Sequence, residues 1–326
     1  MGPGGTGRDD QLAGPRPALA ETEVVSAIGE LRRRLVALHD DLLERQRRRE
    51  PAAPSPRGAP AQPPGEAELY ATLLGAFALH RGPLRLGLGH HRSVLELGRY
   101  LIAHAGRVVP REELLELLWP DSGHRQGIHR LHNAVSKLRR VLDRPAARWS
   151  LVRCQDEGYA IERDGLDTDC DRFERLYHMG RLRLAQGDEA AAADAFRAVL
   201  ELYRGDYLAE VPYAEWAQPH RAHFAERRLN ALTCLCDHAL RRGELPLVID
   251  YALEVLIADN LRERAHRQVM RAHHGLGQRA CAIRQYRLCA ALLEKELGVR
   301  PSDATQRLHR AIRDDAELPP ETPFVP

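Results

Sequence analysis

Basic side chains gather in one stretch of the sequence, between Gly123 and Arg153. Eight of its residues are arginine or lysine and only Asp143 is acidic, a local charge of +7, although the whole chain of 326 residues has a formal net charge of +2. A local excess of cations is typical of surfaces that bind phosphates and base edges. The chemistry that this stretch indicates is therefore nucleic-acid binding.

Residues 126–142, within this stretch, have the periodicity of an amphipathic helix. Leu131, Val135, Leu138 and Leu142 recur at spacings of four, three and four, which predicts one buried stripe. At about 100° per residue, the opposite face is polar and basic. It carries Gln126, His129, Asn133, Ser136, Lys137 and Arg140, with Arg130 at its edge. A helix that only supports a core has no need of such a face.

The side chains on this face carry hydrogen-bond donors that can bind acceptor atoms of bases and phosphates. Arginine can form two hydrogen bonds with guanine, asparagine can pair with adenine and lysine reaches either guanine or phosphate, so Arg130, Asn133 and Lys137 are expected to contact base edges. The complete predicted DNA-binding set adds Arg125 and His129, and four arginines near phosphates: Arg139, Arg140, Arg148 and Arg153. His132 is either another reader or a half-buried neighbour of Trp119. The alternative interpretation is a solvated basic face without a ligand.

This helix and the elements around it are predicted to form one domain over residues 66–164. Residues 69–88 alternate as in a small hairpin or sheet, and helices are expected from about Ser93 to Ala105 and from Pro110 to Trp119. After the basic helix, residues 149–153 and 159–163 flank an Asp-Glu-Gly turn and predict a β-hairpin. Three helices followed by a hairpin, with the third helix basic, is the order of a winged helix-turn-helix.

The flanking segments have different patterns. Residues 1–20 are expected to be disordered, and residues 51–65 are a Pro-rich linker. Between them, residues 21–50 predict a helix with heptad spacing from Val24 to Leu42, either a coiled-coil dimer or a helix packed on the same chain. Residues 165–313 are expected to be helical throughout, with glycines between amphipathic helices. Gly243 and Gly277 stand 34 residues apart, which is the tetratricopeptide period and predicts helical repeats. Residues 314–326 are expected to form a loose tail.

The predicted fold class is therefore mainly α. It comprises a winged helix-turn-helix domain followed by an all-α, tetratricopeptide-like helical repeat domain, with an N-terminal heptad helix. We expect no enzyme, because the sequence lacks His-Glu-x-x-His, Gly-x-Ser-x-Gly and phosphate-loop motifs. No metal or other cofactor is expected. Without a long apolar run or a signal peptide, a cytoplasmic, nucleoid-associated protein is expected.

Ordered motifs in both predicted domains resemble the antibiotic regulatory proteins of Streptomyces and their relatives. These join an OmpR-type winged helix to a bacterial transcriptional activator domain, and the resemblance covers about residues 69–313. In the first domain it is carried by Gly106-Arg-Val-Val-Pro-Arg-Glu-Glu-Leu114, Leu118-Trp119-Pro120, Val135-Ser-Lys-Leu-Arg-Arg-Val-Leu142 and Glu157-Gly158-Tyr159. In the second it is carried by Asp167-Thr-Asp, Asp171-Arg-Phe173, Tyr203-Arg-Gly-Asp-Tyr207, Trp216 with Arg227 and Leu229, Arg264-Ala-His-Arg-Gln-Val-Met270 and Glu296-Leu-Gly-Val-Arg-Pro-Ser302.

The resemblance implies a transcriptional activator of a secondary-metabolite gene cluster. Such a protein binds direct repeats in promoter DNA near the −35 region and recruits RNA polymerase holoenzyme. Residues 126–142 correspond to the recognition helix, and the implied polymerase-contact loop comprises Trp119, Pro120, Asp121 and Ser122. We expect a homodimer on DNA, because two linked copies gain effective concentration on a repeated site. The competing hypothesis is a protein-interaction scaffold whose winged helix does not bind DNA. The residues before the first strand are an addition that the resemblance does not explain.

Overall fold

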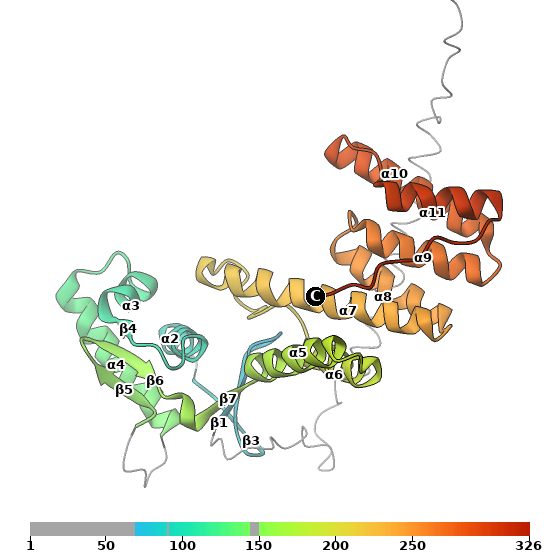
Figure 1. Ribbon diagram of the computed structural model, residues 1–326. Coiled ribbons are helices and arrows are strands. Elements are labelled where there is room, and N and C mark those ends of the chain that lie inside the picture. The colour runs from blue at the N-terminus through green and yellow to red at the C-terminus, as the bar shows by residue number, and fades with distance from the viewer. Residues whose placement is uncertain (1–68, 90, 144–149) are drawn as a thin grey trace, which may run out of the picture. The chain divides into compact units, whose positions relative to one another are not determined.

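The computed structural model describes residues 69–89, 91–143 and 150–326 (Figure 1). The predicted heptad helix, the Pro-rich linker and Arg148 lie outside the described residues. The described chain forms two compact units, one made of residues 69–252 with 321–326 and the other of residues 253–320. Each unit is described by itself.

The first unit contains a winged helix-turn-helix. Helices α2 (Arg92–Ala103), α3 (Arg111–Leu118) and α4 (His124–Leu142) are followed by strands β5 (Val152–Gln155) and β6 (Gly158–Ile161). Strand β4 (Val109–Pro110) joins the hairpin to give the order β4-β6-β5, with antiparallel pairing. Leu97, Leu101, Leu114 and Leu138 are fully buried between the helices. The predicted order of elements is therefore confirmed, with α4 beginning slightly before its expected start.

A second sheet in this unit has four strands in the order β3-β2-β1-β7. Strands β1 (Leu69–Thr72), β2 (Ala78–Arg81) and β3 (Leu84–Leu86) form an antiparallel meander. Strand β7 (Leu166–Thr168) pairs with β1 in parallel, with Leu166 opposite Leu69. The prediction that the chain is helical throughout from residue 165 is thus wrong at its start. The three residues of β7 are too few to show an alternating pattern, and their partner strand lies far away in the sequence.

Helices follow this sheet. They are α5 (Asp169–Ala185), α6 (Glu189–Leu202), α7 (Gln218–Arg241) and α8 (Leu245–Ala258). The boundary between the two units falls within α8. Gly187 and Gly243 have positive φ angles of 79° and 71° in the short turns α5–α6 and α7–α8, where a residue without a side chain is unstrained. Two single-turn helices, η1 (Arg163–Gly165) and η2 (Glu215–Ala217), lie in the connections.

The other unit contains α9 (Glu263–Gly275), α10 (Arg279–Leu297) and α11 (Asp303–Asp314). Its core includes Met270, Ala282, Leu308 and Ile312, all fully buried. As expected, Gly187, Gly243 and Gly277 each stand in a turn between two helices, in the pairs α5–α6, α7–α8 and α9–α10. Helices therefore dominate the described chain, and the predicted fold class is confirmed for it.

The C-terminal segment differs from the loose tail that we expected. In the second unit, Arg271 donates to the carbonyl of Pro319, and Leu318 packs against the core. In the first unit, the N–H of Phe324 donates to Asp237 at 3.0 Å, and the Phe324 side chain packs on the core. Prolines prevent a helix here, but they do not prevent docking of an extended chain.

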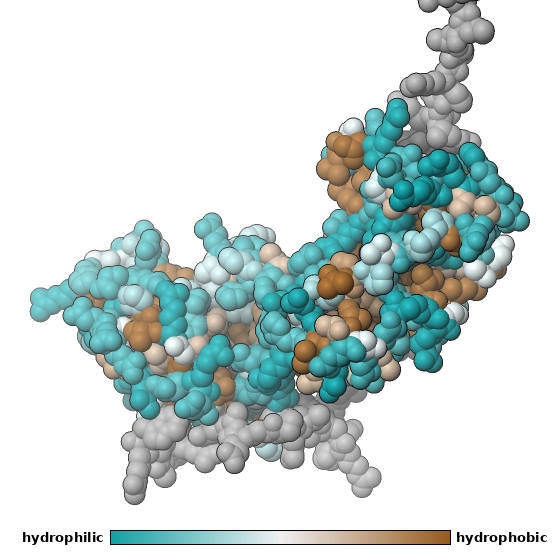
Figure 2. Space-filling model, viewed as in Figure 1, coloured by the Kyte–Doolittle hydropathy of each residue, from teal (hydrophilic) through white to brown (hydrophobic). Residues whose placement is uncertain are grey.

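The surface in view in Figure 2 is largely hydrophilic, with small, separate apolar patches.

Candidate DNA-binding interface

Helix α4 is seated in the core by the stripe that its sequence predicts. Leu131, Val135, Leu138 and Leu142 are each 2% exposed or less. Helix α3 packs closely against α4 at Gly127. A Cβ atom at this position would lie 3.0 Å from Leu115 Cδ2. These contacts fix how the helix is rotated about its axis. They therefore decide which side chains face solvent.

The opposite face of α4 is exposed and is polar or basic along its whole length. The exposed residues are Arg125, Gln126, His129, Arg130, His132, Asn133, Ser136, Lys137 and Arg140. The structure thus brings the three predicted base readers together on one helix face. His132 also belongs to the exposed set, so it is not half-buried beside Trp119, and its role as a reader stays a prediction.

Neighbouring side chains orient these predicted readers. Arg130 Nη1 donates to Ser122 Oγ at 2.9 Å, and Lys137 Nζ lies 3.2 Å from His91 Nε2. Within α4, Asn133 Nδ2 lies 3.2 Å from His129 Nδ1. A contact of this kind restricts the rotamers of a long side chain before any ligand binds, which lowers the entropic cost of binding. The supporting role of His91 could not be predicted from the sequence, because nothing local shows that it faces a lysine 46 residues away.

Two of the arginines expected at phosphates have partners in the protein. Arg139 is half-buried, and its Nε and Nη2 both donate to the carbonyl of Val152, at 3.0 and 2.8 Å. Arg153 forms an ion pair with Glu162 at 3.0 Å in the hairpin. By contrast, Arg125 and Arg140 are exposed and make no ion pair within the part of the chain that the structure describes. Arg139 therefore holds the hairpin against the end of α4.

The loop between α3 and α4 is anchored at one end and exposed at its tip. Trp119 is half-buried against the core, and its N–H donates to the carbonyl of Leu115 at 2.8 Å. Ser122 is the partner of Arg130. Pro120 and Asp121 are exposed. Of the four residues of the implied polymerase-contact loop, these two present the most accessible surface.

The hairpin has a tight turn with a specific steric requirement. Asp156 and Glu157 have positive φ angles of 44° and 63°, as in a two-residue turn between antiparallel strands. Next to them, a Cβ atom on Gly158 would meet the carbonyl oxygen of Val109 at 2.4 Å. The glycine of the Glu-Gly-Tyr motif is therefore needed for the pairing of β6 with β4. This hairpin is the wing.

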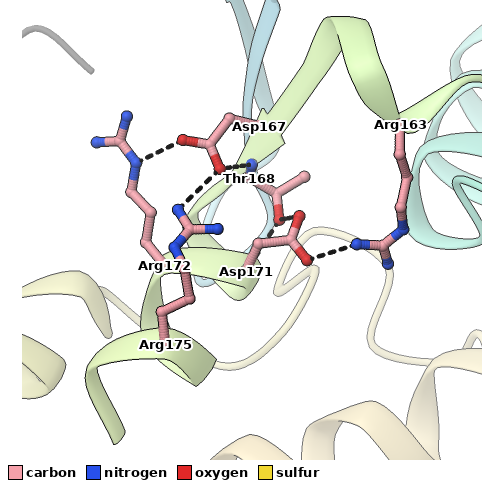
Figure 3. A network of polar contacts seen from close by, with 6 residues as sticks. All are labelled: Arg163, Asp167, Thr168, Asp171, Arg172 and Arg175. Atoms are coloured by element: carbon pink, nitrogen blue, oxygen red, sulfur yellow. Dashed lines mark hydrogen bonds and ion pairs between the residues drawn. The ribbon is translucent and has the colours of Figure 1, made fainter. Parts of the chain in front are cut away.

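A polar network joins the winged helix to the first long helix after it (Figure 3). Asp167 accepts from Arg172 Nε at 2.8 Å and from Arg175 Nη2 at 3.1 Å. Burial raises the pKa of Asp167, but the hydrogen bonds from these two arginines outweigh it, so the net shift is downward. Thr168 Oγ1 caps α5 by accepting from the N–H of Asp171, whose carboxylate also pairs with Arg163. The Asp-Thr-Asp motif thus has a structural role at this junction.

Other kinds of site find little support. In residues 69–89, 91–143 and 150–326, no group of three or more histidine, cysteine or acidic side chains is placed to hold a metal ion. Among the described helices, none has the length and apolar character needed to cross a membrane.

An exposed basic helix held by two others, followed by a wing and joined to helical repeats, is an arrangement found in winged helix-turn-helix transcription regulators. Residues 91–161 match the family described as transcriptional regulatory protein, C terminal, and residues 168–313 match the bacterial transcriptional activator domain. The chain combines the two domains that its motifs indicated, in the order of the Streptomyces antibiotic regulatory proteins, and the relatives that it matches are regulatory proteins of Streptomyces.

Two curated relatives illustrate the family. The chain is 29% identical over 267 residues to regulatory protein AfsR of Streptomyces coelicolor, in a match that covers 80% of this chain and 26% of AfsR. It is 28% identical over 263 residues to regulatory protein DnrI of Streptomyces peucetius, covering 75% of this chain and 95% of DnrI. The chain thus spans about a quarter of the length of AfsR and nearly all of DnrI.

A solved structure shares the fold. It is Mycobacterium tuberculosis EmbR in complex with a low affinity phosphopeptide, with a TM-score of 0.67 and 21% identity. The match covers 78% of this chain and 67% of EmbR.

Proposed function

We propose that this chain is a transcriptional activator of antibiotic-related genes that binds direct repeats near the −35 region of a promoter and recruits RNA polymerase. The observation that carries this proposal is the exposed face of α4, where Arg130, Asn133 and Lys137 lie in line while the opposite face is locked in the core. A helix in this setting can enter the major groove and present its donors to base edges.

The charges around these readers support a duplex ligand. Arg125 and Arg140, near the two ends of α4, are exposed and extend the basic surface along the helix. Phosphates on either side of a major groove would meet such cations. Asn133 adds a neutral amide, which a purely electrostatic surface has no use for. DNA binding would place the protein at the nucleoid.

The proposal extends to two protein partners. Pro120 and Asp121 form an exposed loop tip beside α4, and we assign the contact with RNA polymerase to this tip. Two copies on a repeated site would gain effective concentration by contacting each other. The heptad segment Val24–Leu42 is one candidate for that contact. Deleting residues 1–65 should then lower affinity for a double site and leave base preference unchanged.

The proposal is tested by sequencing genome fragments captured with wild-type protein and with the double variant Arg130→Ala/Asn133→Ala. We expect enrichment of a repeated motif near promoters with the wild type and loss of that motif with the variant. Titration of the captured site between about 50 and 200 mM salt should show a steep fall in affinity, because counterions are released from phosphates. No enriched motif, together with affinity that does not depend on salt, would favour the scaffold hypothesis.

A further inference from the structure

The three predicted base readers on α4 differ in what they can present to a base. Arg130 and Lys137 carry only hydrogen-bond donors, so they present donors whichever way their end groups are turned. The amide of Asn133 carries a donor, Nδ2, and an acceptor, Oδ1. A half-turn of this amide exchanges the two groups. What Asn133 reads therefore depends on which way round its amide lies.

The contact with His129 fixes the orientation of this amide. Asn133 Nδ2 lies 3.2 Å from His129 Nδ1, one helical turn earlier on the same exposed face. An amide nitrogen can only donate, so Nδ1 accepts, and the neutral ring carries its proton on Nε2. Within the described part of the chain, Asn133 has no other side-chain partner. The amide is thus held with its nitrogen toward His129 and its oxygen turned away.

The order of donor and acceptor decides whether an amide fits adenine. In the major groove adenine presents an acceptor, N7, beside a donor, the N6 amino group. An amide forms both hydrogen bonds only when its N–H meets N7 and its oxygen meets N6. The reversed amide would face each base atom with a group of the same kind. The side chain that orients the Asn133 amide therefore decides whether Asn133 can read adenine from its place on α4.

We propose that His129 is a positioning residue for base recognition: by accepting from Asn133 Nδ2, it sets the order in which the amide presents its donor and acceptor. This inference rests on the proposed function and deepens it, because it assigns specificity at one base position to a pair of residues. His129 acts on the base through Asn133, and its Nε2–H stays available to a phosphate oxygen.

Two replacements at position 129 separate this role from a change in charge. Lysine can only donate, so His129→Lys should turn the amide round and reduce preference at the base read by Asn133 at least about five-fold, although it adds a cation. Glutamate can only accept, so His129→Glu should keep that preference while it weakens binding to every duplex. His124→Lys and His124→Glu are the matched controls, because His124 is exposed at the start of α4, far from Asn133. Both should leave base preference unchanged.

The measurement is competition binding of the full-length chain to four duplexes that differ in one base pair, at the position where Asn133→Ala relaxes preference. In the Asn133→Ala chain, His129→Lys should change this preference no further. A preference kept by His129→Lys, a preference lost in His129→Glu, or a further loss in the Asn133→Ala chain would overturn the proposal.

Failure of this inference is distinguishable from failure of the proposed function. If the wild type shows no base preference on any duplex, the proposed function fails, and the positioning role fails with it. If the wild type shows a preference that Asn133→Ala leaves unchanged at every position, only the positioning role is overturned.

Discussion

The carboxylate of Asp169 accepts a hydrogen bond from the backbone N–H of Leu73 at 2.8 Å, across 96 positions of the chain. Its second oxygen accepts from the N–H of Leu74 at 2.9 Å. Asp169 is the first residue of α5, and Leu73 follows directly after β1. One buried side chain thus satisfies the backbone at the end of the sheet and fixes the start of the first long helix after the wing. The four-stranded sheet and α5 are therefore joined through this side chain.

Replacing Asp169 with alanine should destabilise the fold. Two buried N–H groups would lose their acceptor, and we expect the free energy of unfolding to fall by about 2–6 kcal/mol, since each orphaned group costs about 1–3 kcal/mol. Urea titration followed by circular dichroism measures the change. Asp194→Ala, at a side chain that is 77% exposed, is the control and should change stability little. An equally small effect at both positions would show that the anchor contributes nothing.

The stability of the chain should fall on mild acidification because of His266. This side chain is 1% exposed, its Nε2 lies 2.9 Å from the carbonyl of Asn260, and Gln285 Nε2 approaches its Nδ1 at 2.7 Å. The Asn260 carbonyl can only accept, so Nε2 carries the proton, and Nδ1 must then accept from the Gln285 amide. Burial lowers the pKa of His266 below its ordinary value of 6.5, against the Asn260 bond, which favours protonation.

The sign of the pH dependence follows. Below about pH 6.5 the unfolded chain binds a proton that folded His266 does not bind, so the contribution of His266 is fully present above pH 6.5 and is lost as the pH falls. We expect the free energy of unfolding to drop by up to about 1.4 kcal/mol per pH unit between the folded and unfolded pKa values. Denaturant titrations at several pH values measure this slope. His266→Gln should reduce it, and an unchanged slope in that variant would contradict the assignment.

Binding assays should distinguish residues that read bases from residues that contact phosphates. Arg130→Ala or Asn133→Ala should cost about 1–3 kcal/mol on the preferred site and relax preference at one base position, because a base-edge contact is lost. Arg140→Ala should weaken binding to specific and random duplexes alike. Ser122→Ala removes only the side-chain partner of Arg130 and should have a smaller effect than Arg130→Ala. If Arg130→Ala, Asn133→Ala and Arg140→Ala each weaken binding to specific and random duplexes equally, another face of α4 reads the DNA.

The wing should be sensitive to one methyl group. Gly158→Ala would place a Cβ atom 2.4 Å from the carbonyl oxygen of Val109, so β6 must move away from β4. We expect a loss of about 1–3 kcal/mol in the free energy of unfolding, as for other overpacked sites. Gly123→Ala is the control, because no atom lies within 4 Å of its added Cβ. Comparable stability of the two variants would show that the wing tolerates the shift.

The recognition helix could be predicted because its signals are local. The spacing of Leu131, Val135, Leu138 and Leu142 defines the buried stripe, and helix geometry then fixes the exposed face on the other side. The wing could be predicted for the same reason, because two short strand-like segments flank an Asp-Glu-Gly turn. The exposed position of His132 follows from the same geometry but needed the structure to settle it.

Long-range partners could not be predicted from the sequence. Strand β7 pairs with a strand almost a hundred residues earlier, and Phe324 docks on a helix 87 residues away. Neither segment has a periodicity that shows where it packs. Arg139 illustrates the same limit within the site, since charge alone cannot distinguish an arginine that faces DNA from one that holds a neighbouring strand.

Arg139 and its neighbour Arg140 should therefore behave differently when each is replaced with glutamine. Arg139 donates twice to the carbonyl of Val152, at the start of β5, while Arg140 is exposed. We expect Arg139→Gln to lower the free energy of unfolding by about 1 kcal/mol through the lost hydrogen bond. Arg140→Gln should leave stability unchanged and make the slope of log K against log salt shallower by about 0.9, the value for one phosphate. Thermal unfolding and salt titration on one duplex measure both effects. A shallower slope for Arg139→Gln at unchanged stability would return Arg139 to the phosphate contacts that its charge first indicated.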